Sequence, residues 1–288
     1  MPKYLNFESN GSGIAQIKNA QGKLKNKIIY LDSNAKSMNG FNELKIEGEN
    51  TYFQLLPDLK KNRQIIYVNG HSGSGKTFWI KRYLQEYKKI YPKNEIYCFS
   101  PFENDVSFEG VSLKNIKIEP ELIQDNLTSK DFENSICVFD DVEALSNRSL
   151  RKEVLRIMDD ILCTGRHFNV SACVVFHEAC NGALTKKVLN ESHAIVFFPT
   201  TLGTRSLKYL CDQYLGMDKD EIKRLKKLKT RAVAIIKSYP KLVLSEKEIY
   251  ALCDGSDSDS SESSDSEEEI VFTRKKTTIK KKKDGKFI

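Results

Sequence analysis

The sequence contains no pair of cysteines with the spacing Cys-x-x-Cys, and its seven cysteines are an odd number. Several of them stand inside apolar runs, as Cys137 does in SICVF and Cys173 does in SACVVF. The four histidines also lack the spacing of a metal site. We therefore expect buried free thiols in a reducing compartment, and neither a disulfide framework nor a zinc site.

Long apolar stretches are also missing. No window of about 18 uncharged apolar residues occurs, which is the length that a membrane-spanning helix needs. The start MPKYLNFESN lacks the apolar stretch of a signal peptide. These absences predict a soluble, intracellular protein without a membrane partner.

The chain has 288 residues, of which 40% are hydrophobic, and this is enough for one principal domain with appendages. We assign a core domain to residues 61–252 and a β-rich N-terminal extension to residues 1–60. The tail, residues 253–288, consists of an acidic serine run (254–269) and a basic run (274–286). Neither run can bury apolar surface, so we expect the tail to be disordered. Its serines next to acidic residues also suggest sites for an acid-directed kinase.

Apolar runs and polar connections alternate through the core, which predicts an α/β fold. Runs rich in Ile, Val and Phe are typical of strands buried on both faces, and helix-period segments lie between several of them. The pattern indicates a mainly parallel sheet flanked by helices. The predicted strands are 65–70, 95–100, 135–141, 170–177 and 193–199, and the predicted helices are 76–90, 148–163 and 181–190. A helical stretch and two further strands, joined at Tyr239-Pro240, are expected after residue 200.

The segment GHSGSGKT fits the P-loop pattern GxxxxGK[ST], and it follows a predicted strand and opens a predicted helix. Its glycines let backbone N–H groups turn inward and form an anion-binding nest at a helix N-terminus. Lys76 is expected to reach the β and γ phosphates of ATP, and the Thr77 hydroxyl to hold Mg²⁺. The predicted nucleotide-binding residues are Gly70, His71, Ser72, Gly73, Ser74, Gly75, Lys76 and Thr77.

The segment SICVFDDVE supplies acidic side chains at the end of another predicted strand. Asp140 is placed to hold Mg²⁺, with Thr77 as the other metal-binding residue, and Asp141 is placed to act as base for the attacking water. Glu143 competes with Asp141 for the role of base. His177, at the end of the fourth strand, is a candidate to sense the γ phosphate or orient water, and a histidine with a purely structural role is the alternative.

Arg166, in TGRHFN, is the candidate arginine finger, because a guanidinium can neutralise charge on the transferring phosphoryl group. An ion pair with Asp159 or Asp160 on its own helix is the structural alternative. The competing candidates for the finger are Arg148, Arg151 and Arg205, and Asn190 is a second candidate sensor beside its reading as a helix cap.

With these residues, the chain resembles the poxvirus-type genome-packaging ATPases of nucleocytoplasmic large DNA viruses, within the FtsK/HerA superfamily of P-loop ATPases. The resemblance rests on GHSGSGKT, on VFDD, and on TGRHFNVSACVVFH followed by KKVLNESHAIVFF. It extends into RAVAIIKSYPKLVL and so covers about residues 60–250. In this family the sensor is commonly Gln, where this chain has His177, and the second acid is often Glu in the wider superfamily, where this chain has Asp141. The shorter acid keeps Glu143 in consideration.

The resemblance implies a RecA-like sheet with strand order 5-1-4-3-2, a homo-oligomeric ring, and ATP-driven translocation of double-stranded DNA into capsids. By position, Lys76 and Thr77 are the phosphate and magnesium residues, Asp140 and Asp141 the acid pair, and His177 the sensor. It also implies capsid proteins as further partners, and a place in cytoplasmic viral factories of the host cell and in the virion. Basic clusters that suit a grip on phosphates without reading bases are KRLKKLK (223–229) and KKTTIKKKK, although a solvated helix face explains the first equally well.

Two other functions compete with the motor. A P-loop nucleotide or nucleoside kinase would need an arginine-rich lid, and no compact segment of that kind is evident. A slow-turnover ATP-binding assembly scaffold would need only one acid at the strand tip, whereas this chain has two. A GTPase is excluded because no NKxD follows the fifth predicted strand.

Overall fold

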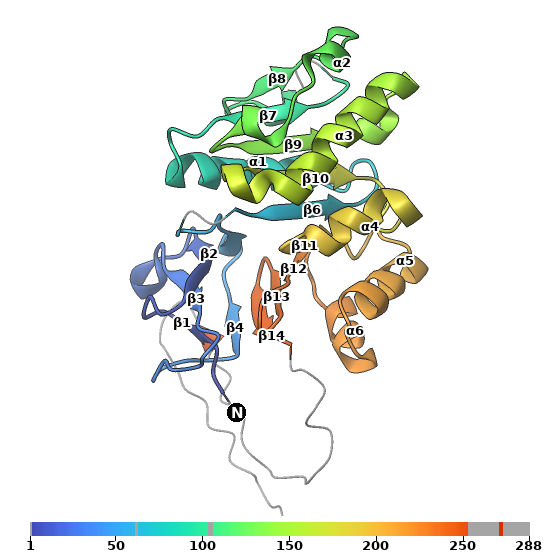
Figure 1. Cartoon of the computed structure of the whole chain (residues 1–288). Helices are drawn as coiled ribbons and strands as arrows, with labels where there is room; N and C mark the ends of the chain where they lie inside the picture. The colour runs from blue at the N-terminus through green and yellow to red at the C-terminus, as the bar shows by residue number, and fades with distance from the viewer. Residues whose placement is uncertain (1, 61–62, 103–105, 253–270, 273–288) are drawn as a thin grey trace, which may run out of the picture.

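The structure is a computed structural model that describes residues 2–60, 63–102, 106–252 and 271–272. It is a mixed α/β fold built on two sheets (Figure 1). The strands are β1 Leu5–Asn6, β2 Ser12–Lys18, β3 Ile28–Leu31, β4 Glu43–Ile46, β5 Tyr52–Leu55, β6 Ile65–Asn69, β7 Ile96–Phe99, β8 Lys114–Ile116, β9 Ile136–Asp140, β10 Ser171–Phe176, β11 Ala194–Phe197, β12 Val233–Ile236, β13 Leu242–Ser245, β14 Glu248–Ala251 and β15 Val271–Phe272. The helices are α1 Lys76–Ile90, α2 Glu121–Asp125, α3 Arg148–Thr164, α4 Gly182–Glu191, α5 Thr204–Tyr209 and α6 Lys219–Lys226, and a π-helical turn follows α5 at Leu210–Tyr214.

The centre of the larger sheet has the strand order expected of a RecA-like ATPase. Strands lie in the order β11-β6-β10-β9-β7, and every neighbouring pair is parallel. Numbered along the chain, these strands read 5-1-4-3-2, so the predicted fold class and strand order are confirmed. Each of the five strands falls inside the range predicted for it, and β8 adds a further parallel strand beside β7.

An antiparallel extension continues the larger sheet beyond β11. Strands β12, β13 and β14 follow one another in antiparallel pairs, which confirms the strand pair predicted around Tyr239-Pro240. Strand β4, from the N-terminal extension, pairs with β14 and so joins the sheet of the core. The rest of the extension forms a separate four-stranded sheet in the order β1-β3-β2-β5.

The predicted tail, residues 253–288, lies outside the described residues except for Val271–Phe272. These two residues form β15 and pair with β4 in parallel, where the sequence analysis expected disorder. They are the apolar pair between the acidic and the basic run, so they are suited to a sheet edge in a way that their charged neighbours are not.

Side chains of β6 alternate between two apolar layers, one on each face of the sheet. Ile65 and Tyr67 pack in one layer with side chains of α3 and α4, and Ile66 and Val68 pack in the other with side chains of α1. Because both faces are covered, the central strands are continuous apolar runs rather than alternating ones. The six cysteines among the described residues are free thiols, and Cys98, Cys137, Cys173 and Cys211 are buried as predicted, whereas Cys180 is half-buried and Cys163 is exposed.

The packing of α3 is open to a direct test. Ile157 is fully buried between α3 and the sheet, so Ile157→Ala should leave a cavity and lower the free energy of unfolding by about 2–5 kcal/mol. Urea denaturation measures this loss. The control Ile123→Ala removes a side chain that is 40% exposed on α2, and it should change stability by about 0.5 kcal/mol or less. Equal losses in the two variants would contradict the burial of this face of α3.

Candidate active site

The loop from β6 to α1 forms the phosphate cradle that the sequence predicts. Gly73 and Gly75 have φ angles of 75° and 108°, in the left-handed region that favours glycine. Gly70 is confined by packing, since a Cβ there would lie 2.7 Å from Ser74 Oγ. The Gly70 amide donates to the Phe176 carbonyl, 3.3 Å away at the end of β10. The cradle therefore lies at the carboxyl edge of the parallel strands, where α/β sheets bind ligands.

Lys76 opens α1 and directs its ammonium back into the cradle. Its Nζ donates to the carbonyl oxygens of Gly70, at 2.8 Å, and His71, at 3.3 Å. Burial lowers the pKa of Lys76, and the negative charges of Asp141, Asp140 and Glu143 oppose that effect. The side chain is held among carboxylates at the place where a P-loop lysine meets the phosphates of a nucleotide.

The acidic residues lie together after β9. Asp140 is the last residue of that strand and is 5% exposed. Asp141 follows with a φ of 51°, a left-handed conformation that Asp adopts more readily than most residues. Its Oδ1 lies 3.0 Å from His177 Nε2. Asp141 and His177, which come from two neighbouring strands, therefore form a direct contact.

His177 is the centre of this group of side chains. Its Nδ1 lies 3.3 Å from Lys76 Nζ, and its backbone N–H donates to Glu143 Oε1 at 2.7 Å. Adjacent parallel strands β9 and β10 bring the residues together, because both strands end at the same edge of the sheet. Lys76, Asp141 and Glu143, all predicted as catalytic candidates, thus each contact His177.

The residues at this edge suit a magnesium ion. Mg²⁺ is bound in nucleotide sites by few protein oxygens together with substrate phosphates. Thr77 and Asp140 supply a hydroxyl and a carboxylate, which are hard oxygen ligands. Within the described part of the chain, no group of three or more His, Cys, Asp or Glu forms a site that could hold a metal by itself. The donor set fits an ion that is shared with a nucleotide.

Arg231 contacts the cradle, and the sequence analysis missed it. Its Nε donates to the Ser74 carbonyl at 2.8 Å, and its Nη2 lies 3.5 Å from the Gly73 carbonyl. A Cβ on Gly75 would come within 2.9 Å of its guanidinium. Arg231 precedes β12, which is antiparallel to β11 and therefore begins at the carboxyl edge. The sequence predicted the strand that follows Arg231 but not its antiparallel pairing with β11, so the sequence analysis could not place Arg231 beside the cradle.

The candidate arginine finger lies elsewhere. Arg166 is exposed in the turn before β10, at the amino edge of the sheet, opposite to the cradle. Asn190 also lies near that edge, in the last turn of α4, and its carbonyl accepts from Lys237 Nζ at 3.0 Å. Neither residue is brought to Lys76 within the chain.

The other arginine candidates follow strands that end at the carboxyl edge. Arg148 begins α3, and Arg205 is exposed in the first turn of α5. Arg151 Nη1 lies 3.5 Å from the Glu143 carbonyl, which ties it to the acidic segment.

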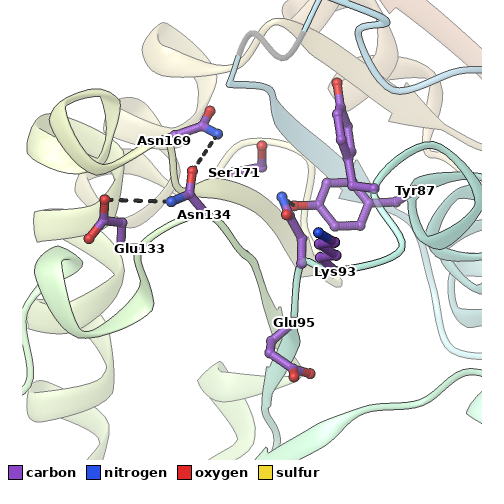
Figure 2. Close-up of a pocket in the computed structure, with 9 residues that line it drawn as sticks. Tyr87, Lys93, Glu95, Glu133, Asn134, Asn169 and Ser171 are labelled. Atoms are coloured by element: carbon purple, nitrogen blue, oxygen red, sulfur yellow. Dashed lines mark hydrogen bonds between the residues drawn. The ribbon is translucent and has the colours of Figure 1, made fainter.

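A polar pocket of about 410 Å³ lies at the amino edge, away from the cradle. Figure 2 shows its side chains, several of which are hydrogen-bonded to one another. Asn169 Nδ2 donates to Asn134 Oδ1 at 3.0 Å, and Asn94 Nδ2 donates to the Tyr87 hydroxyl at 3.0 Å. Since strands β9 and β10 begin here, the pocket is separated from the catalytic candidates by the length of the sheet.

Arg231 should support nucleotide binding. Arg231→Ala removes the guanidinium that contacts the carbonyls of Gly73 and Ser74. The backbone amides of the cradle, which bind the phosphates, are then held less firmly in orientation. We expect ATP affinity to fall about tenfold, as for the loss of one charge-assisted hydrogen bond. Titration with a fluorescent ATP analogue measures the change. The control Arg156→Ala removes an arginine paired with Glu153 on α3, and it should leave affinity unchanged. Unchanged affinity in Arg231→Ala would contradict the role.

Glu143 should make stability depend on pH. Burial raises the pKa of its carboxyl above the ordinary value of 4.5, and the hydrogen bond from the His177 amide opposes that rise. A carboxyl with a raised native pKa stabilises the fold at low pH, and this contribution is lost as pH rises through that pKa. Glu143→Gln keeps an acceptor but cannot ionise. Its stability relative to the parent should therefore be higher at about pH 7 than at about pH 4.

Urea denaturation of both proteins at the two pH values checks this sign. Glu121→Gln, which removes an exposed carboxyl at the start of α2, is the matched control. A relative stability of Glu143→Gln that falls with rising pH would contradict the burial effect.

No helix in the described ranges has the length and apolar character needed to cross a membrane. A scan against models of known protein families finds no match for this chain. Among solved structures, the chain is similar to B204, the DNA-packaging ATPase from Sulfolobus turreted icosahedral virus, with 14% identity, a TM-score of 0.45, and coverage of 67% of this chain and 100% of that chain. It is also similar to the pCW3 conjugation coupling protein TcpA with ATPgS, with 12% identity, a TM-score of 0.37, and coverage of 84% and 77%. These TM-scores are low, and the fold assignment rests on the strand order of this chain itself.

A comparison with curated proteins finds a relative with a higher sequence identity than these structures. A protein of Sputnik virophage, described as uncharacterized protein V3, is 35% identical over 250 residues, which cover 85% of this chain and 98% of that protein. The match spans nearly the whole of the relative and includes most of this chain. The chain belongs to the protein family of the Sputnik virophage V3 protein.

Proposed function

We propose that this protein is an ATP-hydrolysing motor that moves double-stranded viral DNA into capsids. One observation carries the proposal: Lys76 and Asp141 both contact His177 at the carboxyl edge of a sheet in the order 5-1-4-3-2. A phosphate cradle alone is compatible with many nucleotide-binding functions. The acidic pair beside the cradle supports hydrolysis, and the resemblance of the motifs to packaging ATPases supports DNA as the polymer that is moved.

The chain's own residues supply the chemistry of hydrolysis. The amides of the cradle bind the phosphates, and Lys76 neutralises charge on the β and γ oxygens. Mg²⁺, when held by Thr77 and Asp140, supplies further charge neutralisation at those oxygens. To the acidic pair and His177 we assign the orientation and deprotonation of the attacking water. Binding and positioning, rather than covalent catalysis, thus lower the barrier.

A basic surface covers α6 and the segment that follows it, and it suits contact with DNA phosphates. Lys223, Lys226, Lys227 and Lys229 are exposed on this segment. A pocket of about 500 Å³ beside it is lined by five basic and two acidic residues. Lysines that contact phosphates without reading bases give the binding mode that a translocase needs.

The same segment leads directly to the nucleotide site. Lys229 is two positions before Arg231, whose guanidinium donates to the cradle. A shift of the basic segment is therefore passed to the carbonyls of Gly73 and Ser74 through very few covalent bonds. This short connection supports coupling between the grip on DNA and the state of the nucleotide.

We infer that the motor acts as a homo-oligomeric ring. Arg166 is exposed at the amino edge of its own sheet, so as a finger it would serve the nucleotide of a neighbouring subunit. Capsid proteins are further partners by resemblance, and the place of action is the cytoplasmic viral factory of the host cell and the virion.

The decisive experiment measures the ATPase rate with and without long duplex DNA at two salt concentrations. We expect stimulation by DNA that falls steeply with salt, because lysine contacts with phosphates release counterions. Lys76→Ala should abolish hydrolysis while thermal unfolding shows a retained fold. A requirement for a small phosphate acceptor would indicate a kinase instead. A slow rate that ignores DNA would indicate an assembly scaffold.

A further inference from the structure

The contacts of His177 fix the tautomer of its ring. A lysine ammonium can only donate hydrogen bonds, so His177 Nδ1, at 3.3 Å from Lys76 Nζ, must be the acceptor. The ring proton of a neutral imidazole then lies on Nε2, the nitrogen that stands 3.0 Å from Asp141 Oδ1. The ring thus lies between the Lys76 ammonium at Nδ1 and the Asp141 carboxylate at Nε2.

We propose that His177, rather than Asp141, takes the proton from the attacking water, and that Asp141 orients the imidazole and stabilises its charged form. The proposal rests on the proposed ATP hydrolysis and names the base within that site. A carboxylate that holds one ring nitrogen while the other nitrogen accepts a proton is the arrangement by which histidine bases work in hydrolases on unrelated folds. It reassigns Asp141 from base to positioning residue.

Nucleotide binding activates the base. In the resting site Lys76 occupies Nδ1, so this nitrogen cannot accept a proton from water. When the Lys76 ammonium turns to the β and γ phosphates, it leaves Nδ1. Water that takes the place of the ammonium can then donate to Nδ1. The base is thus free only when the substrate is bound.

Charged side chains from several elements surround the His177 ring. Asp141 and Glu143 come from the segment after β9, and Lys76 comes from α1. Asp140 also lies near the Lys76 ammonium, and Glu178 follows His177 in the chain.

Glu143 has a different role from the one first considered for it. Its Oε1 accepts from the His177 backbone amide at 2.7 Å. This bond holds the backbone that carries the imidazole, so Glu143 is a positioning residue and not the base. Two carboxylates of one short segment therefore hold the same histidine, one at the ring and one at the amide.

The step balances without a further reactant. The water oxygen forms a bond to the γ phosphorus, and the bond from that phosphorus to the bridging oxygen breaks, leaving the electron pair on ADP. One water proton moves to His177 Nδ1, and the other stays on the phosphate that is formed. The imidazolium then releases its proton to solvent, which returns the ring to the Nε2-protonated tautomer.

The first test measures the tautomer by nitrogen NMR of the histidine rings and needs no turnover. In the protein without nucleotide, His177 should carry its proton on Nε2 and accept at Nδ1. Addition of a non-hydrolysable ATP analogue should change the Nδ1 shift as Lys76 leaves. The spectrum of His177→Gln assigns the signal. A resting ring protonated on Nδ1, or an Nδ1 shift that the analogue leaves unchanged, would overturn the proposal.

The second test is kinetic. His177→Gln keeps a side chain that can donate and accept hydrogen bonds but cannot take a proton, so kcat should fall about 100-fold or more. His167→Gln is the matched control in the exposed turn before β10, and it should keep the parental rate. Thermal unfolding checks that both variants are folded.

A double-mutant cycle tests whether His177 and Asp141 act as one unit or contribute independently to turnover. Asp141→Asn should also slow turnover about 100-fold or more while ATP stays bound, and the double variant should be little slower than His177→Gln alone. Multiplied losses, or a His177→Gln rate within about threefold of the parent, would overturn the proposal while leaving the ATPase function intact. If the parental protein hydrolyses no ATP, the proposed function fails instead, and the tautomer measurement still reports the resting contact.

Discussion

The constraint on which the site depends is a lysine ammonium that is nearly removed from water. Lys76 is 7% exposed, and burial lowers its pKa, yet three nearby carboxylates favour its charged form. An ion in such a place needs acceptors at every moment. Two carbonyls of the cradle and the ring of His177 serve as these acceptors. The residues that will handle water and phosphate are thereby kept in contact with one another.

The sheet supplies these acceptors and acids through its strand order. Because β6 lies beside β10, and β10 beside β9, one edge collects the cradle, the histidine and the acidic pair. Each element contributes only one or two side chains, and no element could form the site alone. The antiparallel extension adds Arg231 to the same edge from a strand that runs in the opposite direction. The catalytic candidates thus come from the parallel half of the sheet, and Arg231, which contacts the cradle, comes from the antiparallel half.

Much of this arrangement could be predicted from the residues. The apolar runs located the five parallel strands, and GHSGSGKT and VFDD located the edge at which Lys76 and Asp141 lie. Contacts that depend on the angle of a single residue could not be predicted. The left-handed turn at Asp141 and the bond from the His177 amide to Glu143 are of this kind. The pairing of β4 with β14 and β15 was also missed, because hydrophobic periodicity carries no information about which strands are neighbours.

The most distant of these pairings shapes how the chain folds during synthesis. Strand β4 is made well before its partners β14 and β15, and Tyr250 aligns with Glu43 across this long separation in sequence. The edge of β4 therefore stays unpaired during synthesis until β14 has left the ribosome. Contacts of such long range are slow to form, and open strand edges invite other chains to pair with them. A polypeptide that stops short of β14 would leave this edge of β4 unpaired permanently. Premature termination would therefore yield an aggregation-prone chain rather than a smaller enzyme.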